Sequence, residues 1–407
     1  MKTCAHTGVA AIAVLAIAAA AGAQQHVEGQ IGPGSLYALD VPVAWNGDLV
    51  VYAHGIVDPA LPVALPAAQD NFTAVRDALL SRGFAVASSS FSANGFALKD
   101  AVDRTHQLAG LFTAQFGRPR RVVLAGHSLG SMAALQLAES HPTQYDAALV
   151  MCGFVGGTSR EIAHMANARI AFDYFFPGVI PGTVFSIPPG LDYRPGTPLF
   201  LQVQAALVAG FAPPYKTLQL AAVAGLPWTT PQELVAAGLN VIGFNLRYTQ
   251  NVLNLVHGHI PFDNRATVYA GSLDDTALNA GIQRWTGDPD ALNYIAKYYT
   301  PTGALQIPVQ TLHSSLDPVV PAWHEPAYAQ LAAEQGSTAF LEQEIVPAFG
   351  HCAFTDAQVL TAFDRLSRTI THSRSTSRQP SAALRRSDHS SGPAIRQAVS
   401  VAIAPPA

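Results

Sequence analysis

Short apolar segments alternate with amphipathic helical segments along the first part of the chain. Residues 36–44 alternate apolar and polar side chains, which predicts a strand, and Asn46-Gly47 then predicts a hairpin turn. Four more strands are predicted by short apolar runs, at 49–53, 84–88, 121–125 and 147–152. Helical spacing predicts helices among them, at 72–82, 99–116 and 131–140. Strands alternating with helices indicate an α/β fold with a mostly parallel central sheet flanked by helices.

The alternation stops between residues 156 and 299. This stretch has helical patterns and many prolines but little strand signal. Thr230-Pro231-Gln232-Glu233 is typical of a helix start, with a capping box and proline at the first helical position. We expect a large, mostly helical cap inserted after the sixth strand. The alternative is a second packed domain with no part in substrate choice.

The strand pattern returns at 307–314 and 338–346, and a final helix is expected at 355–372. Beyond it the chain is rich in Ser, Arg and Pro, which predicts a disordered, solvated tail rather than an arginine-rich segment that binds an anionic surface. The predicted organisation is a signal peptide at 1–23, a first core segment at 24–155, the cap at 156–299, a second core segment at 300–372 and the tail at 373–407.

The first residues have the pattern of an export signal. Lys2 is followed by an unbroken run of small apolar residues at 9–21, and Ala21-Gly22-Ala23 fits the small-x-small cleavage rule. We expect cleavage after Ala23 and a secreted or periplasmic mature protein. A membrane anchor is the alternative, but the run is shorter than the roughly 20 residues that a spanning helix needs. No later stretch is predicted to cross a membrane.

Composition excludes some classes of function. The chain has 407 residues, is 49% hydrophobic and carries a net charge of −4, so no basic surface for nucleic acid is expected. It has no G-x-G-x-x-G and no phosphate-binding loop, and we expect no cofactor. His257 and His259 alternate as a metal pair would, but no third ligand is evident nearby, so no metal site is predicted.

Gly126-His127-Ser128-Leu129-Gly130 is the strongest chemical motif. A predicted strand enters it and a predicted helix leaves it, which is the context of a nucleophile elbow. The two glycines stand where a sharp turn leaves no room for side chains, and the helix N-terminus favours a developing oxyanion. We therefore predict that Ser128 is a nucleophile; an ordinary helix-capping serine is the alternative.

A serine nucleophile needs a base, and the base needs a carboxylate that fixes its tautomer. His351 follows a predicted strand and precedes the last helix, which favours it over the two competing histidines, His313 and His372. Asp317 lies just past a strand end, in Asp317-Pro318, where a turn is expected. Asp274 and Asp275 also compete but lie in the predicted cap. The order Ser128, Asp317, His351 is the order expected for this kind of fold.

Acyl transfer also needs two backbone N–H groups that bind the oxyanion. One is expected from Leu129, immediately after the nucleophile. The other is expected from the loop after the strand that ends at His54-Gly55, from Ile56 or alternatively Gly55, with His54 in a structural role.

With these pieces in order, the chain resembles the α/β-hydrolase superfamily and is similar to secreted bacterial serine esterases and lipases. The matching segments are "YAHGI" at 52–56, "GHSLG" at 126–130, "SLDPVVP" at 315–321 and "FGHCAF" at 349–354. The resemblance implies an eight-stranded sheet and a catalytic triad, but it implies no particular substrate. The predicted cap matches no subfamily.

The resemblance also bears on the two cysteines that follow the signal. In tannase- and feruloyl-esterase-like members, the cysteine after the catalytic histidine pairs with one directly before the nucleophile. Here position 127 is histidine, so that pattern is broken, and Cys152 is the remaining candidate partner of Cys352. Such a bridge would tie the histidine loop to the sheet; the alternative is two buried free thiols.

The expected function is that of an exported carboxylic ester hydrolase that acts through an acyl-enzyme. The apolar predicted cap suggests a bulky or hydrophobic substrate, either a small molecule or a polymer. One alternative is a peptidase or amidase, which would need acidic residues in the cap to anchor a peptide terminus, with Glu161, Asp173 and Asp192 available. A non-catalytic exported binding protein is the other. The sequence sets no oligomeric state.

Overall fold

The computed structural model describes residues 24–66 and 72–377. The chain divides into two compact units. The first ends at Ile370 and contains every strand of the sheet. The second begins at Thr371, and its described residues are the end of the last helix. The predicted signal peptide and residues 378–407 of the predicted tail lie outside the described residues.

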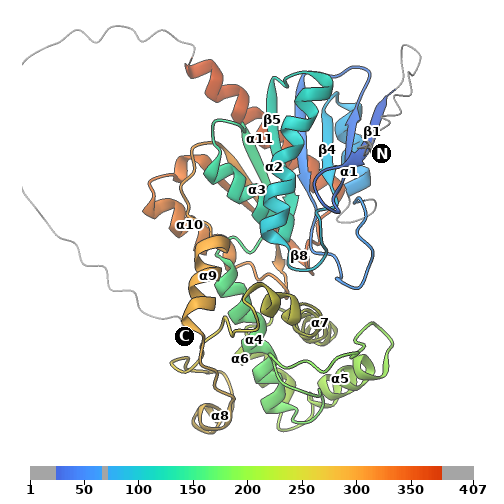
Figure 1. Ribbon diagram of the computed structural model, residues 1–407. Coiled ribbons are helices and arrows are strands. Elements are labelled where there is room, and N and C mark those ends of the chain that lie inside the picture. The colour runs from blue at the N-terminus through green and yellow to red at the C-terminus, as the bar shows by residue number, and fades with distance from the viewer. Residues whose placement is uncertain (1–23, 67–71, 378–407) are drawn as a thin grey trace, which may run out of the picture. The chain divides into compact units, whose positions relative to one another are not determined.

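An eight-stranded sheet organises the first unit (Figure 1). Its strands are β1 (Gln25–Gln30), β2 (Leu36–Val41), β3 (Asp48–Ala53), β4 (Ala85–Ser89), β5 (Arg121–His127), β6 (Ala147–Met151), β7 (Val309–Leu316) and β8 (Leu341–Phe349). Their order in space is β1-β2-β4-β3-β5-β6-β7-β8. β2 pairs antiparallel with both β1 and β4, and every other pairing is parallel. The predicted mostly parallel sheet is confirmed.

The central parallel strands, β3 to β6, are buried on both faces, which is why they appear in the sequence as short apolar runs. Along β3, Val51 belongs to one hydrophobic cluster and its neighbours Val50 and Tyr52 belong to another, because successive side chains point to opposite faces. Helices cover each face. The first cluster includes apolar residues of α2 (Leu98–Phe116) and α3 (Leu129–Ser140), and the second includes those of α1 (Phe72–Ser81) and α11 (Asp356–Ser377).

The helices before and after the sheet's centre lie close to their predicted places. They are α1 (Phe72–Ser81), α2 (Leu98–Phe116), α3 (Leu129–Ser140) and α11 (Asp356–Ser377), and a further helix, α10 (His324–Glu334), lies between β7 and β8. α3 begins two residues before its predicted start, directly after Ser128, and α11 ends five residues beyond residue 372. α10 was not predicted.

Six helices fill the chain between β6 and β7. They are α4 (Thr158–Phe175), α5 (Pro198–Ala209), α6 (Lys216–Ala224), α7 (Pro231–Leu255), α8 (Asp275–Gly281) and α9 (Pro289–Tyr299). Figure 1 shows them gathered beyond one end of the sheet. The capping box at the start of α7 is present, since Thr230 accepts from the Glu233 N–H and the Glu233 side chain accepts from the Thr230 N–H. Among the described residues, no helix combines the length and the apolar character needed to cross a membrane.

The predicted hairpin at Asn46-Gly47 is wrong. β4 lies between β2 and β3, so the two strands that this turn connects are not neighbours. The turn is real, with φ of 91° at Gly47 and an Asp48 N–H bond to Asn46 Oδ1 of 2.8 Å. It leads the chain into the parallel part of the sheet instead of back along β2. β1 was also missed, because its sequence has few apolar residues and its side chains are mostly exposed.

Candidate active site

Ser128 lies in a strained turn between β5 and α3. Its backbone has φ of 50° and ψ of −119°, a conformation that L-residues rarely adopt. A Cβ on Gly126 would lie 2.3 Å from the Gly130 carbonyl oxygen, and a Cβ on Gly130 would lie 2.2 Å from the Ala53 carbonyl oxygen. Only glycine fits either position. The two glycines therefore allow the strand and the helix to meet sharply enough to present the Ser128 side chain.

The structure brings Ser128, His351 and Asp317 into one hydrogen-bonded chain. His351 lies in the loop between β8 and α11, and its Nε2 is 2.9 Å from Ser128 Oγ. Its Nδ1 is 2.7 Å from Asp317 Oδ2, just beyond the end of β7. The three residues come from the carboxyl ends of three parallel strands, which meet at one edge of the sheet.

Asp317 is held as a carboxylate. It is fully buried, and the N–H groups of Val319 and Val320 each donate to its Oδ1 at 2.9 Å. Burial alone would raise its pKa, but the charge and hydrogen bond of His351, with a contribution from His313, hold the pKa of Asp317 below its usual range. An ionised carboxylate can only accept, so His351 Nδ1 carries the proton and Nε2 is left to accept from Ser128.

The competing residues have other partners. His313 lies on β7, where Nε2 donates to the Val320 carbonyl at 2.7 Å and Nδ1 faces Glu325 at 3.0 Å. Asp274 caps α8 by accepting from the Ala277 N–H, and Asp275 accepts from Ser272. Nothing is described of the His372 side chain.

The two residues whose amides are expected to bind an oxyanion line a common pocket. Ile56 and Leu129 line the same pocket as Ser128. As the first residue of α3, Leu129 has an N–H with no acceptor in the preceding helical turn. Gly55 is not among the pocket's lining residues, and its carbonyl is 2.7 Å from His54 Nδ1. His54 is buried and stacks on Phe91 at a ring distance of 3.9 Å.

The rest of the pocket wall is mostly apolar and comes largely from helices between β6 and β7. α4 and α7 contribute residues to it, among them Ile162, Met165, Phe244 and Val252. The Phe244 ring also stands edge-on to the His351 ring, at a centroid distance of 6.2 Å. The segment between β6 and β7 therefore forms part of the wall around the nucleophile.

One of the three acidic residues considered as anchors for a peptide terminus lies in this wall. Glu161, on α4, lines the pocket, and its Oε2 accepts from His324 Nε2 at 3.0 Å. His324 Nδ1 accepts from the Gly156 N–H at 3.0 Å, which fixes its proton on Nε2. Burial raises the pKa of Glu161 well above its usual range and lowers that of His324 to about 2, so both groups favour their uncharged forms. The sequence signals neither burial nor this pairing, because the two residues are 163 positions apart.

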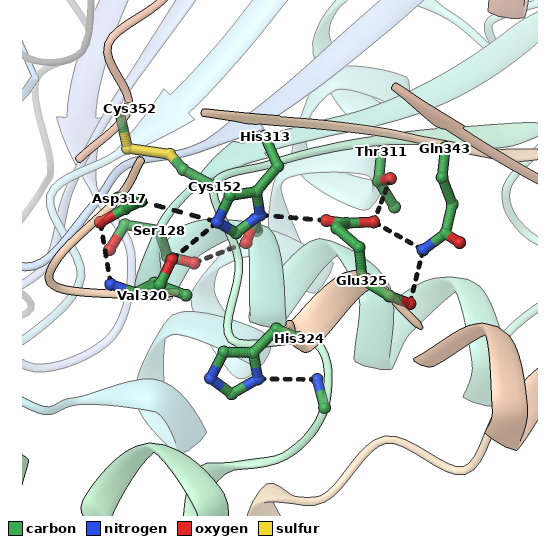
Figure 2. Close-up of polar contacts among 12 residues, drawn as sticks. Ser128, Cys152, Thr311, His313, Asp317, Val320, His324, Glu325, Gln343 and Cys352 are labelled. Atoms are coloured by element: carbon green, nitrogen blue, oxygen red, sulfur yellow. Dashed lines mark hydrogen bonds and ion pairs between the residues drawn. A yellow bond between two sulfur atoms is a disulfide. The ribbon is translucent and has the colours of Figure 1, made fainter. Parts of the chain in front are cut away.

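Cys152 and Cys352 form a disulfide, with a Cα–Cα distance of 5.2 Å (Figure 2). The bridge joins the end of β6 to the residue after His351. The neighbouring Met151 carbonyl accepts from the Ser128 N–H at 2.9 Å. The disulfide thus links the backbone beside Ser128 to the backbone beside His351. His127, which occupies the position of the missing cysteine, faces the Tyr52 hydroxyl at 3.0 Å.

The histidine pair considered as a metal site lies elsewhere. His259 Nδ1 is 3.1 Å from Asp288. Within residues 24–66 and 72–377, the group with metal-ligating potential consists of Cys152, Cys352 and His351, and its two sulfurs are joined in the disulfide.

The topology and the elbow define the class of protein. A sheet with an antiparallel second strand, a serine at the turn after β5, an acid after β7 and a histidine after β8 is the α/β-hydrolase fold. The family model of a tannase-like family of unknown function (DUF6351) matches residues 33–239, and the chain belongs to this family. No curated relative matches the sequence.

Solved structures with a similar chain path include enzymes of two kinds. An esterase of Pyrococcus furiosus, Pf2001, is 10% identical with a TM-score of 0.42, over 86% of this chain and 91% of its own. Est1E from Butyrivibrio proteoclasticus is 12% identical with a TM-score of 0.39, over 86% and 99% of the two chains. A proline iminopeptidase from Mycobacterium smegmatis is 12% identical with a TM-score of 0.42, over 86% and 100%.

Proposed function

We propose that this protein is an exported serine hydrolase that cleaves carboxylic esters through an acyl-enzyme. The single observation that carries the proposal is the hydrogen-bonded chain from Ser128 through His351 to the buried Asp317. Each distance is within the reach that proton transfer requires. The chain ends in a pocket whose wall is mostly apolar, where an ester can lie against the serine oxygen.

The reaction follows from the direction of these hydrogen bonds. Ser128 Oγ attacks the ester carbonyl carbon while His351 Nε2 takes its proton, and the Leu129 and Ile56 amides bind the oxyanion. Collapse of the tetrahedral intermediate breaks the bond to the alcohol, which leaves with the proton from His351. Water then attacks the acyl-enzyme by the same route and releases the acid. Asp317 orients His351 and stabilises its charged form.

The acidic residues favour an ester over a peptide as substrate. A site that binds the amino terminus of a peptide needs a charged carboxylate that is not already paired with another side chain. Of the three candidates, Asp173 accepts from Arg169 and Asp192 accepts from Arg194. Glu161 does line the pocket, but its raised pKa favours the neutral acid. A binding protein without activity would have no use for the full serine, histidine and carboxylate chain.

Two further parts of the proposal concern substrate size and location. We propose that the 156–299 segment acts as a cap that selects bulky or hydrophobic esters, since α4 and α7 supply apolar wall residues. Export is supported by the signal pattern at residues 1–23 and by the disulfide, because disulfides persist in oxidising compartments.

The test is hydrolysis of p-nitrophenyl esters from acetate to palmitate by the protein that starts at Gln24. We expect kcat/KM to rise with chain length to an optimum and then fall, because the pocket wall is apolar but bounded. The p-nitroanilide of the best acyl group serves as the matched amide and should turn over more slowly. Faster cleavage of the anilide would favour the peptidase or amidase alternative. Failure of both series with folded protein would favour a binding protein.

A further inference from the structure

A second histidine–carboxylate pair lies behind the candidate acid. His313 is fully buried on β7, four residues before Asp317. Its Nδ1 is 3.0 Å from Glu325 Oε1, on α10, and its Nε2 is 2.7 Å from the Val320 carbonyl oxygen. Figure 2 shows the His313 ring between these two partners, with Asp317 beside it.

The hydrogen-bond partners of His313 and Glu325 determine which of their atoms carry protons. A carbonyl oxygen only accepts, so His313 Nε2 carries a proton. Glu325 Oε2 accepts from Gln343 Nε2 at 2.6 Å and from Thr311 Oγ1 at 2.5 Å. Burial alone would lower the pKa of His313, but the hydrogen bond and charge of Glu325, helped by Asp317, raise it. His313 and Glu325 together therefore favour an imidazolium–carboxylate pair.

This pair reaches Asp317 in two ways. Val320 accepts from His313 through its carbonyl and donates its N–H to Asp317 Oδ1 at 2.9 Å, so His313 holds the residue that holds the acid. His313 Nε2 also lies 3.7 Å from Asp317 Oδ2, the oxygen that faces His351. A positive charge on His313 therefore lies beside the carboxylate oxygen that accepts a hydrogen bond from His351 Nδ1.

The other titratable groups around this cluster favour uncharged forms. Burial raises the pKa of Glu161 and lowers the pKa of His164 and of His324. Arg160 acts electrostatically on His324. The charged groups that face His313 directly are thus Asp317 and Glu325.

We propose that the His313–Glu325 pair is a positioning device for the candidate triad, which holds Asp317 in place and sets the pH below which Ser128 loses its reactivity. The inference rests on the proposed function. A positive His313 opposes the appearance of a second positive charge on His351 across the shared carboxylate. His351 then stays neutral, and able to accept the serine proton, down to a lower pH than it would beside Asp317 alone.

Two substitutions remove the charge from opposite ends of the pair. Glu325→Gln removes the carboxylate bonded to His313 Nδ1 and leaves Asp317, which is already hydrogen-bonded to His351, so the buried histidine is expected to favour its neutral form. His313→Gln keeps a side-chain donor for the Val320 carbonyl but carries no charge. Glu334→Gln is the matched control, since it removes the same charge from an exposed position at the end of α10.

The measurement is the second-order rate of Ser128 labelling by a fluorophosphonate as a function of pH, with folding checked by circular dichroism. We expect the acidic limb to move to higher pH by about half a unit or more in each variant, as a charge a few ångströms away from a buried site predicts. The double variant should shift no further than either single one, because the two residues act as a unit. Glu334→Gln should leave the limb where it is in the wild type.

The outcomes separate this inference from the proposed function. Wild-type protein that fluorophosphonate does not label contradicts the proposed function itself. Labelled variants whose acidic limb is unmoved, or moved to lower pH, overturn the role of the pair. Loss of folding in both single variants would also overturn it, because the pair would then serve the fold instead of the pH dependence.

Discussion

Replacing Ser128 by alanine is expected to lower kcat for the best p-nitrophenyl ester by a factor of about 10⁵ to 10⁶, which is the scale seen when a serine nucleophile is removed. The physical reason is that Ser128 Oγ, 2.9 Å away, is the hydroxyl that bonds to His351 Nε2, and within the described part of the chain no second hydroxyl takes that place. Alanine leaves the pocket wall and the oxyanion amides unchanged, so a small residual rate above buffer is expected. The measurement is steady-state hydrolysis at the best chain length.

Ser140→Ala is the matched control for that substitution. Ser140 is at the other end of the same helix, α3, where its hydroxyl bonds to the Gln136 carbonyl on the exposed surface. This variant should keep the wild-type rate. Retention of more than a tenth of the activity by folded Ser128→Ala would mean that the ester is cleaved somewhere else.

Asp317→Asn is expected to lower kcat by a factor of about 10⁴, the scale known for this change in a serine triad. The two backbone N–H groups that bind Asp317 determine how the asparagine side chain would be oriented. The Val319 and Val320 N–H groups hold Oδ1 as an acceptor, so an asparagine would keep its carbonyl oxygen there and turn its amide toward His351. The amide donates to Nδ1 and leaves the proton on Nε2, where it blocks transfer from Ser128.

The comparison for this variant is Asp274→Asn, a carboxylate that caps α8 and does not line the pocket. It should lose no activity. The check is kcat together with thermal denaturation of both variants. An Asp317→Asn protein that is folded and nearly as active as the wild type would show that another group orients His351.

The sequence predicted the residues that meet at the sheet edge because their signals are local. Gly126 and Gly130 are needed because a side chain at either position would clash with backbone atoms at the turn. The order serine, acid, histidine along the chain places each of these residues after its own strand. The sequence also left only one possible pair for a disulfide, since just two cysteines follow the predicted signal peptide. These features depend on neighbours in sequence or on order along the chain.

The features that the sequence missed depend on contacts between distant segments. Asn46-Gly47 has the composition of a hairpin turn, but β4 enters the sheet between the two strands that it joins, and only the tertiary fold decides this. Glu161 and Glu325 look like surface residues on helices. Glu161 is buried against His324 and Glu325 against His313 because α4, α10 and β7 pack together. No local sequence pattern predicts this packing.

Mass spectrometry of the fluorophosphonate adduct shows whether Ser128 is the nucleophile. Protein that starts at Gln24 is labelled, digested and mapped, beside protein that was unfolded before labelling. We expect one phosphonyl group, on the peptide that contains Ser128, which appears only in folded protein and disappears in His351→Gln. A folded protein that takes up no label, or a label carried by another residue, would contradict this expectation.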